Sequence, residues 1–125
     1  MNSAVIVAGG LGIRFGNETP KQFNKIHNQE ILSFSVKTFL KHPKIGEVII
    51  VSPPDWMNHV VSEYSECHVI AGGIRRKDSS FNGVTATSTE SINVLIHDAA
   101  RPFVTKEVIS DCLSALENYD GSAPI

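Results

Sequence analysis

Cysteine is scarce in this sequence. Its 125 residues include two, Cys67 and Cys112, which are too few for a disulfide framework and lack the CxxC spacing of metal or redox motifs. We therefore expect both to be buried small apolar residues. The histidines other than His97 also lack the spacing of a zinc site. They are His27, His42, His59 and His68.

An excess of one charge is also missing. There are 11 Lys and Arg against 13 Asp and Glu, a formal net charge of -2, which argues against nonspecific nucleic-acid binding. Any phosphate ligand must therefore be held by local groups. The 42% hydrophobic and 19% charged residues are ordinary for a globular domain, so disorder, collagen and coiled coil are not expected.

Long hydrophobic runs are absent as well. Ala4–Ala8 and Val48–Val51 are far shorter than the roughly 20 residues that span a bilayer. The N-terminus also lacks a basic region followed by a long apolar one, as a signal peptide would have. We therefore expect a cytoplasmic protein that is not bound to a membrane.

Four apolar runs of strand length alternate with helical patterns. The expected strands are Ser3–Ala8, Glu47–Ser52, Cys67–Ala71 and Ile92–His97. The expected helices are Gln29–Leu40, with Asn28 as N-cap, and Trp56–Tyr64, Asp78–Ala86 and Lys106–Asn118. The last of these helices should bury Val108, Ile109, Cys112, Leu113 and Leu116.

This alternation predicts right-handed βαβ units. The expected fold is a doubly wound, Rossmann-like α/β fold with a mostly parallel sheet and helices on both faces. Residues 1–125 should form one such domain. Because the chain stops just after a helix that would lead into another parallel strand, we interpret it as the N-terminal part of a longer protein.

The first segment that could carry chemistry is Ala8–Phe23 (AGGLGIRFGNETPKQF). Its glycines allow consecutive backbone N–H groups to face anionic oxygens, and Arg14 and Lys21 add cations. The spacing matches neither the dinucleotide motif GxGxxG nor the P-loop GxxxxGK. A polyphosphate site is the favoured interpretation. The alternative is a tight turn whose Arg and Lys are only solvated.

Two more segments should reach the same edge of the sheet, because ligands of such folds bind beyond the carboxyl ends of the strands. They are Ala71–Gly83 (AGGIRRKDSSFNG) and Val94–Phe103 (VLIHDAARPF). Asp98 ends the fourth strand, where a hard carboxylate can hold Mg²⁺. It could instead form a turn or a helix cap, although the next helix begins several residues later. His97 is expected to be structural.

Together the three segments, in this order and at these separations, resemble the 2-C-methyl-D-erythritol 4-phosphate cytidylyltransferase family and its relatives, the ribitol-5-phosphate cytidylyltransferases. The similarity runs over essentially the whole chain, and it implies a nucleotidyltransferase-type fold. Family members are about twice this long. The missing half would hold further substrate-binding residues, a catalytic lysine and the arm through which the family forms homodimers.

The resemblance implies a role for each segment. Backbone groups of the first loop would wrap the phosphates of CTP, and these residues are Ala8, Gly9, Gly10, Leu11 and Gly12. Arg14 and Lys21 would be the catalytic cations, since the substrate phosphate attacks the α-phosphorus in line and charge must be stabilised. A phosphate monoester needs no general base. Asp98 would hold Mg²⁺.

The second segment would frame the cytosine and ribose. By resemblance the nucleotide-binding residues here are Gly72, Gly73, Arg76 and Ser79, while Arg75 is an additional basic neighbour. Ser79 could instead be a hydroxyl that satisfies backbone donors at a helix start. In the third segment, Arg101 either binds substrate phosphate or braces its loop.

The favoured function is a Mg²⁺-dependent transfer of CMP from CTP to 2-C-methyl-D-erythritol 4-phosphate, which would release pyrophosphate and serve isoprenoid synthesis by the non-mevalonate pathway. Ribitol 5-phosphate is the alternative polyol phosphate acceptor. A hexose-1-phosphate nucleotidylyltransferase fits the second and third segments less well. A hypothesis of another class is that these residues bind CTP without turnover.

Overall fold

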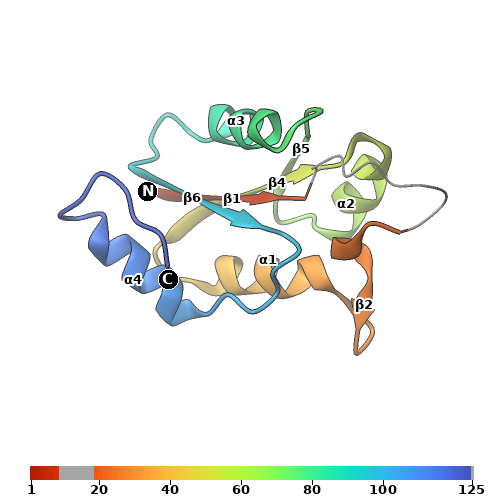
Figure 1. The fold of residues 1–125 in the computed structure, drawn as a ribbon, viewed down its shortest axis with the longest axis horizontal. Helices are drawn as coiled ribbons and strands as arrows, with labels where there is room; N and C mark the ends of the chain where they lie inside the picture. Colours follow the sequence, from red (N-terminus) through yellow and green to blue (C-terminus); the bar gives the residue numbers. More distant parts are fainter. Residues whose placement is uncertain (9–18, 125) are drawn as a thin grey trace.

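A computed structural model describes residues 1–8 and 19–124 (Figure 1). Within this part of the chain, four parallel strands form a sheet in the order β5-β4-β1-β6. They are β1 (Asn2–Val7), β4 (Ile45–Ser52), β5 (His68–Ala71) and β6 (Asn93–Asp98). The four expected strands are therefore confirmed, with ends that shift by one or two residues.

Helices cover both faces of this sheet. They are α1 (Ile31–Lys41), α2 (Met57–Glu63), α3 (Arg76–Ala86) and α4 (Lys106–Ala115), with short 3-10 turns η1 (Lys21–Phe23) and η2 (Pro54–Trp56). Figure 1 shows α3 on one side of the sheet and α1 and α4 on the other. The doubly wound arrangement is confirmed. None of the helices in residues 1–8 and 19–124 is long and apolar enough to cross a bilayer.

The two central strands are apolar on both faces because helices cover both. Ala4, Ile6 and Ile50 face the larger core, which includes side chains of α1, α2 and α4. Val5 and Val51 face the smaller one, with Ala86 of α3 packed against it. All of these strand side chains are fully or almost fully buried. The sheet is thus a rigid base for the loops that leave its carboxyl edge.

Strand β6 lies at one edge of the sheet. In the described residues it pairs with β1, and its Ile96 side chain is 51% exposed. An exposed apolar strand at a sheet edge offers backbone groups to another strand.

The region before α1 differs from the expectation. Asn28 does not cap the helix; it lies in the turn of a hairpin made by β2 (Lys25–Ile26) and β3 (Gln29–Glu30). His27 and Asn28 both have positive φ angles, of 51° and 63°. Asn tolerates this conformation, and a two-residue hairpin turn needs it at both positions. The helix therefore begins later, at Ile31, with Glu30 at the N-cap position.

Two expectations of burial were too strong. Cys67 and Cys112 are free and only partly buried, since Cys67 packs against the outside of the core and Cys112 lines a cavity. Burial nevertheless raises the pKa of the Cys67 thiol to about 11.

Helix α4 ends at Ala115 rather than Asn118, and the chain continues in turns. Its fully covered side chains are Ile109 and Leu113, while the other apolar positions are partly exposed.

Candidate functional site

A small cavity lies at the carboxyl edge of the sheet, where three segments meet. Its volume is about 180 Å³, and it is lined by Val7, Ala8, Gln22, Arg76, Asp98 and Ala100. These residues come from the end of β1, the η1 turn, the start of α3 and the end of β6. The expected convergence of three separated stretches is therefore confirmed.

Arg76 and Asp98 face each other across this cavity. The Arg76 Nη1 atom lies 3.5 Å from Asp98 Oδ2. The other carboxylate oxygen, Oδ1, accepts a hydrogen bond of 3.0 Å from the Ala100 backbone N–H. Asp98 thus also forms a turn, as the alternative interpretation proposed. Both side chains remain partly exposed, so a ligand can reach the pair.

The two neighbouring arginines at the start of α3 have different partners. Arg75 Nε donates to Asp78 Oδ2 at 3.1 Å, within its own helix end. This hydrogen bond lowers the pKa of the Asp78 carboxyl. Asp78 Oδ2 also accepts from the Arg75 backbone N–H, so this carboxylate caps the start of α3. Arg76, and not Arg75, lines the small cavity. The nucleotide-binding role that the resemblance implies for Arg76 stays a prediction.

The glycine pair after β5 lies close to α3. A Cβ atom on Gly73 would lie 2.5 Å from Asp78 Cβ, so only glycine fits there. The Gly73 backbone N–H donates to Ser79 Oγ at 3.1 Å, and Gly72 N–H donates to the Ser52 carbonyl at 2.8 Å. Ser79 itself is completely buried. Its hydroxyl therefore holds the glycine turn, and a contact with ribose stays a prediction.

The loop that contains Arg101 is braced from inside the protein. The Arg101 carbonyl accepts hydrogen bonds from His97 Nε2 at 2.8 Å and from Ser35 Oγ at 3.1 Å. Burial lowers the pKa of His97, which favours the neutral ring. The structural role expected for His97 is thus confirmed. The Arg101 residue is exposed and lines a wider hollow of about 880 Å³, next to Phe103 and the small cavity.

Gln22 is a site residue that the sequence pattern did not indicate. Its Nε2 donates to the Ala8 carbonyl at 2.5 Å, and its side chain is buried and lines the small cavity. This bond ties η1 to the end of β1. Lys21, the preceding residue, is exposed at the start of η1. Gln22 belongs to the PKQF segment, but a glutamine beside a lysine does not by itself indicate a site residue. Only the fold shows that it lies against Ala8.

The remaining predicted site residues lie outside the described part of the chain. These are Gly9, Gly10, Leu11, Gly12 and Arg14. Among residues 1–8 and 19–124, no three His, Cys, Asp or Glu side chains group together in a way that could hold a metal ion. Asp98 is the carboxylate that lines the small cavity. A cation there would need oxygen ligands from the substrate and water as well.

Comparison with known proteins assigns the chain to a family. The family model for 2-C-methyl-D-erythritol 4-phosphate cytidylyltransferase matches residues 2–125. The chain belongs to this family. A curated 2-C-methyl-D-erythritol 4-phosphate cytidylyltransferase from Clostridium botulinum (strain Loch Maree / Type A3) is 37% identical over 128 residues, covering 98% of this chain and 56% of the relative.

Solved structures agree with this assignment. The 4-diphosphocytidyl-2C-methyl-D-erythritol synthase of Anaerococcus prevotii is 27% identical, with a TM-score of 0.76 over 93% of this chain and 50% of that one. The cytidylyltransferase structure from Francisella tularensis is 26% identical, with a TM-score of 0.75 over 95% and 54%. The nucleotidyltransferase-type fold is therefore confirmed. The chain spans about half the length of the cytidylyltransferases that it matches.

Proposed function

We propose that this chain provides the nucleotide site of a cytidylyltransferase that transfers CMP from CTP to 2-C-methyl-D-erythritol 4-phosphate. The products would be pyrophosphate and a CDP-alditol for isoprenoid synthesis. One observation carries the proposal beyond family membership. Ala8, Arg76 and Asp98, from three segments far apart in the sequence, line one cavity at the carboxyl edge of the sheet.

The reaction joins two anions, so the site must supply positive charge. An oxygen of the acceptor phosphate would attack the α-phosphorus of CTP as the bond to the pyrophosphate oxygen breaks. Arg76 lies at the cavity, and Lys21 begins the turn that Gln22 ties to Ala8. With Arg14, these cations would stabilise the charge that develops on the transferred phosphoryl group and on pyrophosphate.

The residues present fit a magnesium ion. Asp98 Oδ2 is a hard oxygen ligand whose charged partner, Arg76, is 3.5 Å away, longer than a close ion pair. This oxygen could therefore turn toward a cation that also binds phosphate oxygens and water. When bound, Mg²⁺ would supply Lewis-acid stabilisation of the triphosphate. Asp98 would hold the ion, and Arg76 would contribute positive charge beside the phosphates.

The base would lie against the turn between β5 and α3. Gly72 and Gly73 bring the backbone close to α3, and Ser79 fixes this turn from below. A backbone without side chains can offer hydrogen bonds to the edge of a pyrimidine and leave little room for a purine. We propose this turn as the basis of a preference for CTP.

The acceptor follows from family membership. The match to the family of 2-C-methyl-D-erythritol 4-phosphate cytidylyltransferases favours that acceptor over ribitol 5-phosphate. The family resemblance also leads us to propose that the whole protein acts as a homodimer in the cytoplasm. Sedimentation of the purified whole protein would test the homodimer, and fractionation of its host cell would test the location.

Calorimetry of the chain with CTP and Mg²⁺ tests the nucleotide site. We expect binding that weakens without Mg²⁺ and that is stronger for CTP than for ATP. Arg76→Ala and Asp98→Ala should each weaken binding, whereas Arg75→Ala is the matched control because Arg75 pairs with Asp78. Equal affinity for both nucleotides would reject the pyrimidine preference. No binding by a folded chain would reject the site.

Turnover is a separate question, tested by pyrophosphate release with CTP, Mg²⁺ and either acceptor. If the remaining substrate groups lie outside residues 1–125, this chain should be nearly inert, since loose positioning of the acceptor forfeits most of the catalytic advantage. Binding without turnover would agree with the hypothesis of a nucleotide-binding module. Rapid turnover would show that the acceptor site is already complete.

A further inference from the structure

The turn that presents Lys21 is held from behind by aromatic rings. Phe23, the last residue of η1, is almost fully buried. Its ring stacks on Trp56 with a centroid distance of 4.4 Å and an angle of 11°, and it meets the edge of His59 at 5.5 Å. Trp56 and His59 also pack edge to face, at 5.3 Å. Three rings from η1, η2 and α2 thus form one unit.

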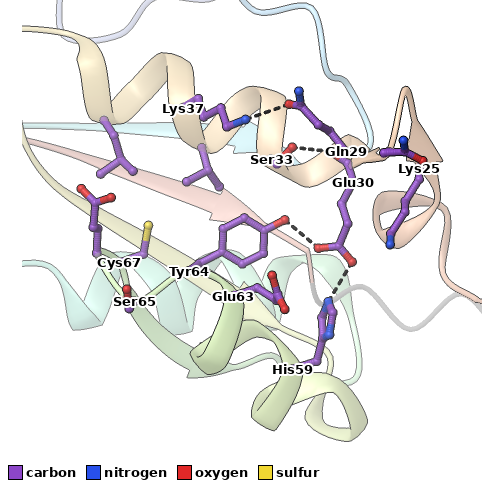
Figure 2. Close-up of a pocket in the computed structure, with 14 residues that line it drawn as sticks. Lys25, Gln29, Glu30, Ser33, Lys37, His59, Glu63, Tyr64, Ser65 and Cys67 are labelled. Carbon is purple, nitrogen blue, oxygen red and sulfur yellow. Dashed lines mark hydrogen bonds and ion pairs between the residues drawn. The ribbon is translucent and has the colours of Figure 1, made fainter.

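Glu30 connects this unit to the start of α1. Its Oε2 lies 2.7 Å from His59 Nε2, and its Oε1 accepts a hydrogen bond of 2.7 Å from Tyr64 Oη (Figure 2). The Glu30 side chain is only 11% exposed. Burial, followed by the bond to Glu30, raises the pKa of Tyr64, so the phenol remains a donor. One carboxylate therefore holds two side chains of the α2 region.

Glu30 also lines a cavity at this joint. A cavity of about 370 Å³ lies between α1, the β2-β3 hairpin and α2, and it is lined mainly by polar side chains, including Glu30, His59, Glu63 and Tyr64 (Figure 2). Side chains of α1 and α2 still meet in the larger core beside this cavity. The two hydrogen bonds of Glu30 add polar contacts between the two regions at the cavity.

The same unit leads to the nucleotide cavity. Gln22 and Lys21 directly precede Phe23, and Gln22 donates to the Ala8 carbonyl. On the other side, the Asn24 carbonyl accepts from the Ile31 backbone N–H at 2.9 Å, next to Glu30. A shift of Phe23 would therefore move Gln22 and Lys21 relative to β1.

We propose that Glu30, His59 and Trp56 are positioning residues, which set where the η1 turn presents Lys21 and Gln22 to the nucleotide cavity. The proposal rests on the function proposed above. It assigns these three side chains no contact with the substrate. Their effect is transmitted through Phe23 to Lys21 and Gln22. A small shift of these two residues matters because the reacting groups of a site must be held to within about 0.5 Å.

Nuclear magnetic resonance can test the placement without nucleotide. The Phe23 and Asn24 amides donate within η1 to Pro20 and Lys21, and the Ile109 amide in α4 is a distant reference. In Glu30→Ala we expect exchange at Phe23 and Asn24 to accelerate about tenfold, without a change at Ile109. Contacts between the Phe23 and Trp56 rings should weaken as well.

Two matched variants define the controls. Glu63→Ala removes an exposed carboxylate from the lining of the same cavity and should leave exchange in η1 unchanged. Glu30→Gln keeps an acceptor for Tyr64 and a polar partner for His59, so it should restore most of the protection. If Glu30→Ala does not fold, Trp56→Leu replaces it, since this change removes the stacked ring and keeps an apolar side chain.

Two results of the exchange measurements would overturn the proposal. Unchanged exchange at Phe23 and Asn24, with the ring contacts intact in Glu30→Ala or Trp56→Leu, would show that this cluster does not position the turn. Equal acceleration at Ile109 would also reject it, because that pattern indicates a general loss of stability.

Calorimetry with CTP and Mg²⁺ then links position to function. Glu30→Ala should weaken binding about tenfold while the chain remains folded, and Glu30→Gln should restore it. Unchanged affinity despite faster exchange in η1 would reject the link to the nucleotide cavity. If the unsubstituted chain binds no CTP, the proposed function fails, and the exchange measurements still decide the positioning role.

Discussion

Helices α1 and α3 cover opposite faces of the same two central strands, but they are held there differently. Helix α1 buries large apolar side chains, with Leu32, Val36 and Phe39 at its interface. Helix α3 buries Ser79 and Gly83, while its Phe81 is 70% exposed. Helix α1 is held by buried apolar area, whereas α3 is held by the close approach of its backbone to the sheet.

This difference in packing corresponds to a difference in what the two helices contribute to the molecule. Arg76 of α3 lines the cavity at the sheet edge, and the buried Ser79 of the same helix holds the glycine turn. Elements that carry binding groups often contribute less to stability than the core does. The comparison implies that α1 determines the stability of this domain, and that α3 depends on one small residue and a few hydrogen bonds.

The strongest test of the comparison exchanges phenylalanine for alanine on each helix. Phe39→Ala removes a ring that is 2% exposed and should lower the free energy of unfolding by about 3–5 kcal/mol. Phe81→Ala, the matched control on α3, should change it by less than about 0.5 kcal/mol. Denaturant unfolding measures both. Similar losses would contradict the distinction between the helices.

The next effect concerns the close approach of α3. A Cβ on Gly83 would lie 2.3 Å from Val5 Cγ1 and 2.9 Å from Val51 Cγ2, and both valines are buried in the sheet. Gly83→Ala should therefore destabilise the chain by about 1–3 kcal/mol despite the better helix propensity of alanine. Gly121→Ala, where a Cβ meets open space, is the control. A gain in thermal stability for Gly83→Ala would disprove the tight packing.

Ser79 tests the polar support at the start of α3. Ser79→Ala leaves the Gly73 N–H without the hydroxyl that accepts its hydrogen bond, so a loss of about 1–2 kcal/mol is expected. Amide exchange at Gly73 should become faster. Ser80→Ala, one residue on, should have a smaller effect on that amide. If Gly73 exchanges at its original rate in Ser79→Ala, another group holds the turn.

Acid should weaken the face that contains α1. His42, at the end of α1, is buried; its Nδ1 accepts from the Lys44 N–H and its Nε2 lies 2.9 Å from Ser110 Oγ. Burial, followed by Lys106 and Lys44, lowers its pKa below the ordinary value of about 6.5. The unfolded chain therefore binds the proton more readily.

The sign of the pH dependence follows from this shift. The stability that neutral His42 contributes is complete above pH about 6.5 and is lost as the pH falls toward the lower folded-state pKa. The free energy of unfolding should decrease over that range. His97 shifts in the same direction, so His42→Asn should flatten the curve only in part. An unchanged slope in His42→Asn would exclude its contribution.

The smallest stability effect is expected at the cavity. The Arg76 and Asp98 side chains are 57% and 36% exposed and 3.5 Å apart, so Arg76→Ala should cost about 0–1 kcal/mol. The coupling between Arg76→Ala and Asp98→Asn in a double-mutant cycle should likewise be small without nucleotide. CTP affinity should instead fall clearly in each single variant. A large loss of stability would indicate a structural ion pair.

The sequence predicted some features of the fold and site correctly and others wrongly. The alternating apolar runs predicted the sheet because buried parallel strands need continuous apolar sequence. Arg76 was distinguished from Arg75 by resemblance. In the structure Arg76 lines the cavity and Arg75 pairs with Asp78, while nucleotide binding by Arg76 stays a prediction. Asn28 was misread, since the same residue type suits a helix cap and a left-handed hairpin turn.

The amino-acid sequence alone determined the fold class, the family and the three segments that meet at the cavity, because each depends on local patterns and on residue order. Only the tertiary structure decided which partners the side chains take. Ser79 turns to Gly73, Gln22 to Ala8 and Glu30 to both His59 and Tyr64. The separations of these pairs along the sequence follow neither a helical nor a strand period. Their hydrogen bonds form only after packing brings the donor and acceptor atoms of separate elements within about 3 Å of each other.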